Sequence, residues 1–578
     1  MMLRRDDVAT PVTGVLDFEG YGNLIDVLER AWQRYPEHIA FSNLGSDLSY
    51  CELDQKSRDF AAYLQCSTVL QPGDRFAIQL PNLLQYPIVL FGALRAGLVV
   101  VNISPQQNVD ELQHQLCDSG AKGLLLQACA ASQLETVIEQ TKLNTVIVTE
   151  QGDALPNWKR FFVNASARYL KTGVPAYHQL PGAVDYCHVM QQGSRLAFSS
   201  LEISGADLAL LQYSGGTTAL SKAAMLTHHN LLANLIQVKL ALNGVTEPGC
   251  ETVIAPLPLY HLYSFTVSCM LMLEIGAKVV LISDSQDTNA FIHELKRHEF
   301  TIFSGSNTLF SDLCQQSAFS SLRFDRLKLT ISGGMALNPA VAECWQQLTG
   351  CSILEGYGLA ETAPIISVNP PAAARLGSIG LPVAGTEIRL VDDDGAEVPV
   401  GGSGELCVRG AQVMQGYWKQ PQQTAQVFDD DGWLRTGDIA SIGERGYLTL
   451  VDRKKDVINV SGFSVYPSEL EQVISAHPDV DDCVVVGVPG FEQGEQVKLY
   501  LVSANPDLTV QQIRQHCRER LTAYKIPSQV EFRKELPRSA VGKVLRRALR
   551  DAEQQKRHPD RPQVALLNGV QSTPFYTE

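Results

Sequence analysis

The stretch YSGGTTALSKAAMLTH, residues 213–228, follows the apolar run LALLQ and leads into the helical pattern NLLANLIQ. The same alternation of apolar, β-branched runs with helical patterns continues over the first 450 residues. Leu53, Phe60 and Leu64, for example, have helical spacing. Three buried strands are predicted: VVVNIS (99–104), TVIVTE (145–150) and AKVVLIS (277–283). Such alternation favours an α/β fold with mainly parallel sheets.

The pattern changes near residue 376. The segment TEIRLVDDDGAEVPVGGSGELCVRG (386–410) has short strands and an Asp394-Gly395 turn, which indicates hairpins. We therefore predict a large N-terminal domain of several subdomains, residues 1–451, whose last part, about 376–451, is rich in β-structure.

A second boundary is predicted where the charged run DRKKD (452–456) interrupts the strand-like YLTLV. Beyond it the pattern predicts a helix, a strand and another helix, at 467–477, 481–489 and 509–523. These elements suffice for a small α+β C-terminal domain, residues 452–555. Residues 556–578 are rich in Gln, Pro, Arg and Asp and are predicted to form a disordered tail.

Composition and charge exclude several classes of protein. The net charge of −15 argues against nucleic-acid binding, which needs a positive field. The 13 cysteines include no C-x-x-C pair, so we expect reduced thiols in a cytoplasmic protein rather than a zinc site. The N-terminus lacks the apolar segment of a signal peptide. Arg95, Glu274 and Lys278 interrupt the longest apolar stretches, so no transmembrane helix is expected.

The stretch 213–228 has the composition of a phosphate-binding loop. Its paired glycines let backbone N–H groups converge on anionic oxygens. Lys222 adds a positive charge, and hydroxyl donors come from Ser214, Thr217 and Thr218. The Walker A pattern G-x-x-x-x-G-K-[ST] is absent. Taken alone, such a stretch is equally typical of a simple turn.

Six further motifs follow in this order: PLPLYH (256–261), TISGGMAL (330–337), LEGYGLAET (354–362), GWLRTGDIA (432–440), VDRKKDVINVSGFSVYPSELE (451–471) and PRSAVGKVLRRALR (537–550). With the phosphate stretch, they resemble the adenylate-forming superfamily of acyl-CoA synthetases, peptide-synthetase adenylation domains and luciferases. Within it, the chain is most similar to bacterial long-chain fatty-acid:CoA ligases. The segments that carry this resemblance are PNLLQYPIVLFGALRAGLVVVN (81–102), DSGAK (118–122), VDRKKDVINVSGF and LPRSAVGKVLRR.

The resemblance implies an enzyme that uses ATP and Mg²⁺ to convert a medium- to long-chain fatty acid into an acyl-adenylate, and then uses CoA to form the thioester. Residues implied to bind the nucleotide or CoA are Tyr213, Ser214, Gly215, Gly216, Thr217, Thr218, Lys222, Gly334, Glu355, Gly356, Tyr357, Gly358, Thr362, Asp438, Arg453, Ser461, Gly462 and Phe463. Residues implied to be catalytic are Thr218, His261, Glu361 and Lys543. Glu361 is the implied ligand of Mg²⁺, a cation that prefers oxygen.

In the large domain, the resemblance places residues 214–222 at the ATP phosphates and Gly334 and Tyr357 at the adenine. Thr362 would lie beside the α-phosphate, and His261 would orient the acyl carboxylate. The alternatives are a buried packing aromatic for Tyr357 and a hydrogen-bonded core histidine for His261.

The resemblance also implies that Asp438 accepts hydrogen bonds from the ribose hydroxyls, with Arg453 assisting. Lys543 would supply positive charge as the carboxylate attacks the α-phosphorus, and losing such a donor typically raises a barrier by about 3–4 kcal/mol. Rotation of the small domain near Asp452 would then bring residues 461–463 to the pantetheine channel. The alternatives are a turn residue for Asp438 and a solvated helix residue for Lys543.

The chain departs from the family loop T-G-G-T-T-G-x-x-K-G at Ser214, Ala219 and Ala223. An alanine forced to positive φ would cost about 1–2 kcal/mol. Two alternative functions remain: a related acyl-AMP ligase that loads an acyl carrier protein, and a non-catalytic acyl- or nucleotide-binding paralogue, which Ala219 and Ala223 suggest. The apolar run FTVSCMLML (265–273) fits either an acyl tunnel or plain core. A lipid substrate is compatible with peripheral inner-membrane contact, and the sequence indicates no oligomeric state.

Overall fold

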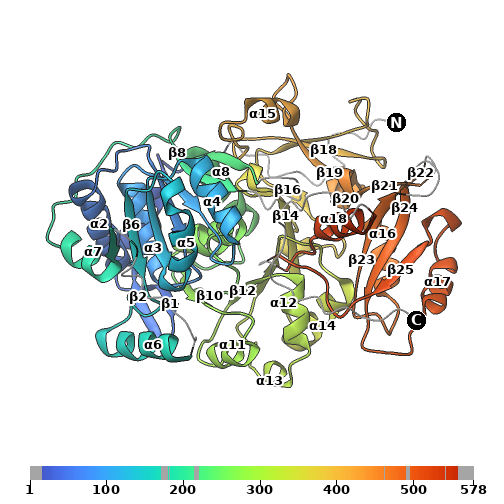
Figure 1. The fold of residues 1–578 in the computed structure, drawn as a ribbon, viewed down its shortest axis with the longest axis horizontal. Coiled ribbons are helices and arrows are strands. Elements are labelled where there is room, and N and C mark those ends of the chain that lie inside the picture. The colour runs from blue at the N-terminus through green and yellow to red at the C-terminus, as the bar shows by residue number, and fades with distance from the viewer. Residues whose placement is uncertain are drawn as a thin grey trace. The chain divides into compact units, whose positions relative to one another are not determined.

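The protein is described by a computed structural model that covers residues 16–170, 180, 182–213, 221–460, 463–489, 495–539 and 542–557 (Figure 1). Two compact units divide the chain: residues 1–436 with 440–450, and residues 437–439 with 451–578. The predicted domain bounds, 1–451 and 452–555, stay a prediction. The two compact units differ from these bounds in that residues 437–439 group with the second unit. The predicted α/β class with mainly parallel sheets is confirmed by the strand pairings below.

Among the described residues, seven strands form a sheet in the order β7-β6-β5-β3-β4-β8-β9. Neighbours pair in parallel except β8 and β9, which are antiparallel. The strands predicted at 99–104 and 145–150 are β4 and β6. The strands are β3 (Arg75–Gln79), β4 (Val99–Asn102), β5 (Gly123–Gln127), β6 (Thr145–Thr149), β7 (Ala183–Asp185), β8 (Leu208–Tyr213) and β9 (Ala223–Thr227).

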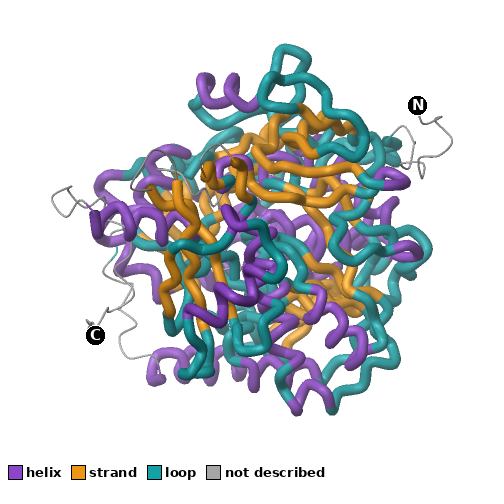
Figure 2. The backbone as a smooth tube through the Cα atoms, turned by 90° about the vertical axis from the view of Figure 1, so that its right-hand side faces the viewer, coloured by secondary structure: helices purple, strands orange, loops and turns teal. Residues whose placement is uncertain are grey.

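Both faces of this sheet are buried, as parallel sheets require. Successive side chains of a strand point to opposite faces, so Val100 joins one hydrophobic cluster and Val101 another. The first face is covered by α2 (Tyr50–Ser67), α3 (Gln85–Arg95) and α7 (Tyr186–Gly193), and the second by α4 (Val109–Ser119) and α5 (Ala131–Val137). Figure 1 labels α2, α3, α5 and α7 around β6, and Figure 2 colours the helices of the chain purple and its strands orange.

A second sheet in the described part of the chain has nine strands in the order β16-β15-β14-β13-β12-β10-β11-β1-β2. The strand predicted at 277–283 is β11. The central strands pair in parallel and the outer ones antiparallel. The strands are β1 (Ile39–Asn43), β2 (Ser46–Ser49), β10 (Thr252–Ala255), β11 (Lys278–Leu281), β12 (Ile302–Gly305), β13 (Leu329–Ser332), β14 (Ile353–Gly358), β15 (Ile365–Val368) and β16 (Leu381–Pro382).

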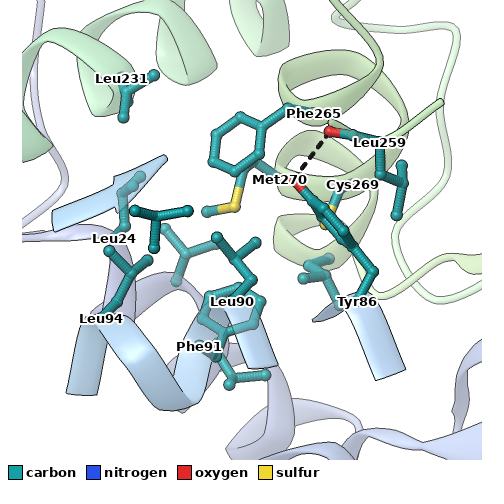
Figure 3. Packing of buried hydrophobic residues seen from close by; sticks show 14 of the residues in the cluster. Leu24, Tyr86, Leu90, Phe91, Leu94, Leu231, Leu259, Phe265, Cys269 and Met270 are labelled. Atoms are coloured by element: carbon teal, nitrogen blue, oxygen red, sulfur yellow. Dashed lines mark hydrogen bonds between the residues drawn. The ribbon is translucent and has the colours of Figure 1, made fainter. Parts of the chain in front are cut away.

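The main core of the first unit surrounds α3, in which every residue is buried. Figure 3 shows Leu90, Phe91 and Leu94 of this helix packed against Phe265 and Met270. The run FTVSCMLML is buried throughout, and its apolar residues belong to this same core cluster. The structure thus shows core packing for this run, and its predicted role in an acyl tunnel stays a prediction.

Other helices of the first unit are α1 (Leu24–Arg34), α6 (Asn157–Leu170), α8 (His228–Ala241), α9 (Leu262–Ser264), α10 (Leu271–Glu274), α11 (Thr288–Leu295), α12 (Asn307–Cys314), α13 (Ser317–Ser320), α14 (Pro339–Thr349) and α15 (Pro421–Val427). The predicted hairpin region forms β17 (Glu387–Val391) and β18 (Ser403–Arg409), which pair antiparallel. They belong to a sheet completed by β19 (Leu434–Ile442) and β20 (Leu448–Arg453).

The second unit has its own core, built on a sheet in the order β23-β24-β25. The predicted helix 467–477 and strand 481–489 correspond to α16 and β23. Its elements are β21 (Ile458–Val460), β22 (Phe463–Val465), α16 (Pro467–Ser475), β23 (Asp482–Pro489), β24 (Glu495–Val502), α17 (Val510–Arg518), β25 (Gln529–Phe532) and α18 (Arg546–Arg557).

Two sequence predictions need correction. The helix predicted at 509–523 ends at Arg518, because the chain turns and then forms a short 3₁₀ helix, Ala523–Lys525. The charged run 452–456 does not interrupt the strand at its first residue: β20 continues through Arg453, and only Lys454–Asp456 form a 3₁₀ turn. Of the helices described, none combines the length and apolarity needed to cross a membrane.

Candidate active site

The two ends of the phosphate stretch are brought together by β-pairing. Tyr213 ends β8 and pairs with Ala223, which begins β9. Residues Ser214, Gly215, Gly216, Thr217 and Thr218 lie outside the described residues, as does Ala219. The expected strain at Ala223 is wrong, because this residue lies in an extended strand and is not among the non-glycine residues at positive φ. Alanine is therefore at no conformational disadvantage there.

Helix α4 holds both ends of this stretch. The Tyr213 hydroxyl donates to the Asp118 carboxylate at 2.7 Å. Burial, together with Asp118, raises the pKa of the Tyr213 phenol. At the other end, His114 Nε2 lies 3.0 Å from the Ser221 carbonyl oxygen. His114 and Asp118, which lie one turn apart on α4, thus contact the residues that flank the predicted phosphate loop, Ser221 and Tyr213.

A tyrosine lies between the two charged residues predicted to act on the ATP phosphates and Mg²⁺. The Tyr417 hydroxyl donates to Glu361 Oε1 at 2.7 Å. The Lys222 Nζ atom lies 4.9 Å from the centre of the same ring, within range of a cation–π interaction. Burial and the Glu361 charge raise the pKa of the Tyr417 phenol, so its hydroxyl stays a proton donor.

Backbone pairing fixes the position of Tyr417. Residues 416–418 lie alongside β9, with the Met225 N–H donating to the Gly416 carbonyl and the Trp418 N–H donating to the Ala223 carbonyl, each at 2.9 Å. Trp418 Nε1 also donates to the Asp118 carbonyl at 3.1 Å. Because residues 416–418 pair with β9, Tyr417 lies beside Lys222, the residue that precedes this strand.

The predicted adenine motif lies on β14, beside the turn that follows β13. Gly334 has φ +85°, a conformation that favours glycine. Gly358 has a packing requirement, because a Cβ there would lie 1.8 Å from the Pro364 carbonyl oxygen. Gly356 has more room, since the nearest atom to its Cβ position would be 3.7 Å away. Tyr357 is buried in a hydrophobic cluster, so its adenine contact stays a prediction.

Glu355 is a buried carboxylate on the same strand. It accepts a hydrogen bond from the Leu337 N–H at 3.1 Å. Burial raises the pKa of this carboxyl to about 7, and the Leu337 hydrogen bond opposes the shift. Near neutral pH the site therefore contains a carboxyl group that is divided between its protonated and charged forms.

Glu355→Gln is expected to change how stability depends on pH. The unfolded carboxyl has a pKa of about 4.3, so between that value and the folded value near 7 only the folded protein keeps the proton. The resulting stabilisation is complete below the unfolded pKa and is lost as the pH rises from there through 7; its size is up to about 4 kcal/mol at 1.36 kcal/mol per pKa unit. Urea unfolding of both proteins, below and above pH 7, should therefore show the variant gaining relative stability at the higher pH. A difference that does not change with pH would contradict the assignment.

Thr362 is fully buried and its hydroxyl serves the local backbone. It donates to the Pro364 carbonyl at 2.6 Å and accepts from the Leu359 N–H at 3.1 Å. His261 is half-buried at the start of α9, where its carbonyl accepts from the Phe265 N–H at 2.9 Å. The predicted roles of both residues in catalysis stay predictions.

In the second unit, Asp438, Arg453 and Lys543 form one charged group. Asp438 is buried, and its Oδ1 lies 3.2 Å from Arg453 Nε. Burial lowers the pKa of Lys543 to about 8, with a further lowering from the Arg453 charge that Asp438 opposes. A tight turn presents the lysine: Gly542 has φ +83°, and the Lys543 carbonyl accepts from the Ser539 N–H at 2.8 Å.

Phe463 is the described member of the predicted pantetheine segment, since Ser461 and Gly462 lie outside the described residues. This residue begins β22. Its ring is largely exposed and stacks on the Tyr524 ring, with 4.9 Å between the ring centres. The predicted contact of Phe463 with pantetheine stays a prediction.

Sequence reasoning missed Tyr417, His114 and Asp118. Asp118 lies in the DSGAK segment that supports the resemblance, but nothing in its spacing points to Tyr213. Tyr417 follows a glycine in QGYWKQP, a context that is common in loops. Only the pairing of residues 416–418 with β9 reveals its contact with the two charged groups.

The comparisons with known proteins agree with one another. Residues 28–418 match the family model for AMP-binding enzyme, and residues 469–543 match that for AMP-binding enzyme C-terminal domain. The chain is 48% identical over 532 residues to the long-chain-fatty-acid–CoA ligase of Salmonella typhimurium, covering 92% of this chain and 94% of the relative. It is 45% identical over 549 residues to the ligase of the same name from Haemophilus influenzae, covering 94% and 97%. ATP-bound MatB from Rhodopseudomonas palustris has a similar fold, with a TM-score of 0.79, 26% identity and coverage of 92% and 99%.

Proposed function

The chain belongs to the AMP-binding enzyme family, in its long-chain acyl-CoA synthetase branch, and from this premise we propose that it is a long-chain-fatty-acid:CoA ligase. It activates a fatty acid with ATP, forms an acyl-adenylate and pyrophosphate, and transfers the acyl group to CoA with release of AMP. The 45–48% identity to ligases of this name over nearly their whole length is the observation that carries the proposal. We further propose that the enzyme acts in the cytoplasm on medium- to long-chain acids.

The first half-reaction needs positive charge, because a carboxylate attacks a phosphorus atom that carries anionic oxygens. We assign this charge to Lys222 on the side of the departing pyrophosphate and to Lys543 at the reacting phosphate. Asp438 and Arg453, which form an ion pair, hold the ribose. Glu355 lies on β14, where its buried carboxyl can bind a polar edge of adenine.

The residues present also fit a magnesium ion. Within the described ranges, no group of three or more His, Cys, Asp or Glu side chains is placed to hold a metal on its own. A single carboxylate, Glu361, suits Mg²⁺, which typically combines one or two carboxylates with the phosphates of the nucleotide. When bound, the ion neutralises charge on the phosphate oxygens. Tyr417 orients the Glu361 carboxylate for this task.

The second half-reaction needs a thiol to reach the acyl carbonyl. We propose that Phe463, with Ser461 and Gly462, borders the pantetheine of CoA, and that Thr218, Thr362 and His261 contact the acyl-phosphate. The alternative acceptor is an acyl carrier protein, which the same chemistry would serve. A non-catalytic paralogue has less support, because the described charged residues form the contacts above and Ala223 is unstrained.

Pyrophosphate release with short-, medium- and long-chain fatty acids, each with and without CoA, tests the proposal. We expect release to depend on the fatty acid and to continue over many turnovers only when CoA is present. Release that stops after one turnover with CoA, and continues when an acyl carrier protein is added, would indicate the carrier-loading function. No release with any acid, while ATP still binds, would favour the non-catalytic alternative.

A further inference from the structure

Three aromatic side chains are exposed together on helix α6 of the first unit. Trp158, Phe161 and Phe162 are 65%, 70% and 66% exposed. Their spacing of three and four residues places them on one face of the helix. The two phenylalanine rings pack edge to face, 5.7 Å apart. In Figure 1, α6 lies at the lower left, beneath β1 and β2. Large apolar patches on a soluble surface usually mark a binding site.

Polar side chains on the opposite face of α6 form hydrogen bonds with the rest of the first unit. The Asn164 side chain donates to Asp153 at 2.9 Å and accepts from the Gly152 N–H at 2.7 Å. The Lys159 ammonium donates to the Gly45 carbonyl and, at 3.2 Å, to the Ser46 hydroxyl of the β1–β2 hairpin. Val163 also packs against the main core from this inner face. The aromatic residues of α6 are nevertheless exposed, whereas an ordinary surface helix buries its aromatic face.

The charge of this region differs from that of the whole protein. The chain has a net charge of −15, yet residues 157–184 contain four cationic residues and no Asp or Glu. The cations are Lys159, Arg160, Arg168 and Lys171. Of these, Arg168 has a side chain that is 59% exposed and also pairs with Glu150. Lys159 and Arg160 contact the protein at Gly45 and Cys187, so Arg168 is the cation of this group described with a largely exposed side chain. An aromatic face with a cation on the same helix is complementary to a surface with an apolar interior and anionic headgroups.

We propose that the exposed face of α6, formed by Trp158, Phe161 and Phe162, is a docking surface for a lipid bilayer. The helix lies in the plane of the interface with its three aromatic rings among the headgroups and upper acyl chains, while Arg168 lies close to anionic headgroups. This inference gives a location to membrane contact and rests on the proposed function, because a long-chain fatty acid is concentrated in bilayers.

The exposed area favours a bilayer over a second copy of the chain. Three aromatic side chains of about 150–250 Å² each, two-thirds exposed, present roughly 400 Å², whereas a stable dimer buries about 800 Å² per partner. A bilayer has no such requirement, because it surrounds each ring. Trp and Phe are also the side chains typical of interfacial helices.

Sedimentation with vesicles tests the surface. The full-length protein is mixed with phosphatidylcholine vesicles that contain phosphatidylglycerol, and with vesicles of phosphatidylcholine alone. The test variant is Trp158→Ser/Phe161→Ser/Phe162→Ser. The matched control is Leu376→Ser/Val400→Ser/Phe532→Ser, which removes three exposed apolar side chains elsewhere. We expect the test variant to bind vesicles about a hundredfold more weakly, the control to match the wild type, and the anionic vesicles to be preferred.

Two further measurements keep the proposal testable if a variant folds poorly. Brominated phosphatidylcholine should quench the fluorescence of the wild type more than that of Trp158→Phe, because only the former has an indole at this face. Pyrophosphate release with hexanoate, which is soluble, should be equal in all variants, whereas release with oleate delivered in vesicles should fall only in the test variant.

Equal vesicle binding by the wild type and the test variant would overturn the proposal. So would a wild-type protein that does not bind vesicles but shows a concentration-dependent mass that the test variant loses, since that identifies a second copy as the occupant. Vesicle binding is measured without substrate, so a chain that binds vesicles but releases no pyrophosphate would refute the ligase function and leave the lipid surface standing.

Discussion

Lys543→Ala is expected to slow fatty-acid-dependent pyrophosphate release by about 10²–10³-fold, the usual cost of losing one preorganised donor at a developing charge. Transfer of the acyl group from a preformed acyl-adenylate to CoA should change less, because in that step the thiol attacks the carbonyl carbon and AMP is the leaving group, so no bond to phosphorus forms or breaks. Rapid-quench measurement of each half-reaction separates the two effects. The structure supports this assignment by grouping Lys543 with Asp438 and Arg453 on a turn fixed by Gly542.

The pH profile provides the control for this prediction. Burial, then Arg453, lowers the pKa of Lys543 to about 8, so the free protein loses this charge as the pH rises through 8. The kcat/KM for adenylate formation reports groups of the free enzyme and should fall over that range. Lys543→Arg stays charged throughout and should lack this fall, even if its rate is lower. Equal slowing of both half-reactions by Lys543→Ala would instead indicate a structural role.

Glu361→Gln is expected to reduce pyrophosphate release by about a hundredfold or more at low magnesium, with partial recovery at high magnesium. The amide is nearly the same size but lacks the charge that Mg²⁺ prefers. The measurement is a magnesium titration at saturating ATP. Because Gln can still accept the hydrogen bond from Tyr417, the variant should keep its folded contacts, and its thermal unfolding should change little.

Tyr417→Phe is the matched comparison. It keeps the ring that contacts Lys222 and removes the hydroxyl that holds Glu361. We expect a milder defect, about tenfold, that also appears in the magnesium requirement, since one hydrogen bond to a charged group is worth about 1.5–3 kcal/mol. If Glu361→Gln lowers activity equally at every magnesium concentration, the assignment of Glu361 as the metal ligand is wrong.

The sequence was sufficient for the elements whose patterns are local. The β-branched runs at 99–104, 145–150 and 277–283 form β4, β6 and β11, because a strand buried on both faces needs a continuous apolar run. The Asp394-Gly395 turn lies between the strands of the predicted hairpin, since glycine alone favours the positive φ of 83° found there.

What the sequence did not reveal depends on contacts between distant segments. Ala223 was expected to be strained because its motif has a glycine there, but its pairing with Tyr213 places it in a strand. Tyr417 has no spacing relation to Lys222 or Glu361, so its contact with both needed the tertiary fold. The exposure of the aromatic face of α6 was likewise hidden, because a helical pattern shows that one face is aromatic but not which face meets the protein.

Helix α4 holds the two ends of the predicted phosphate loop in place through contacts that do not involve the residues between them. His114 and Asp118 contact the residues at its two ends, and the antiparallel pairing of β8 with β9 fixes the separation of those ends. The two ends that bound positions 214 to 220 are therefore held by residues outside that segment. A library of loops from other family members, grafted between Tyr213 and Ser221, would sample nucleotide affinity while leaving the scaffold and its register alone.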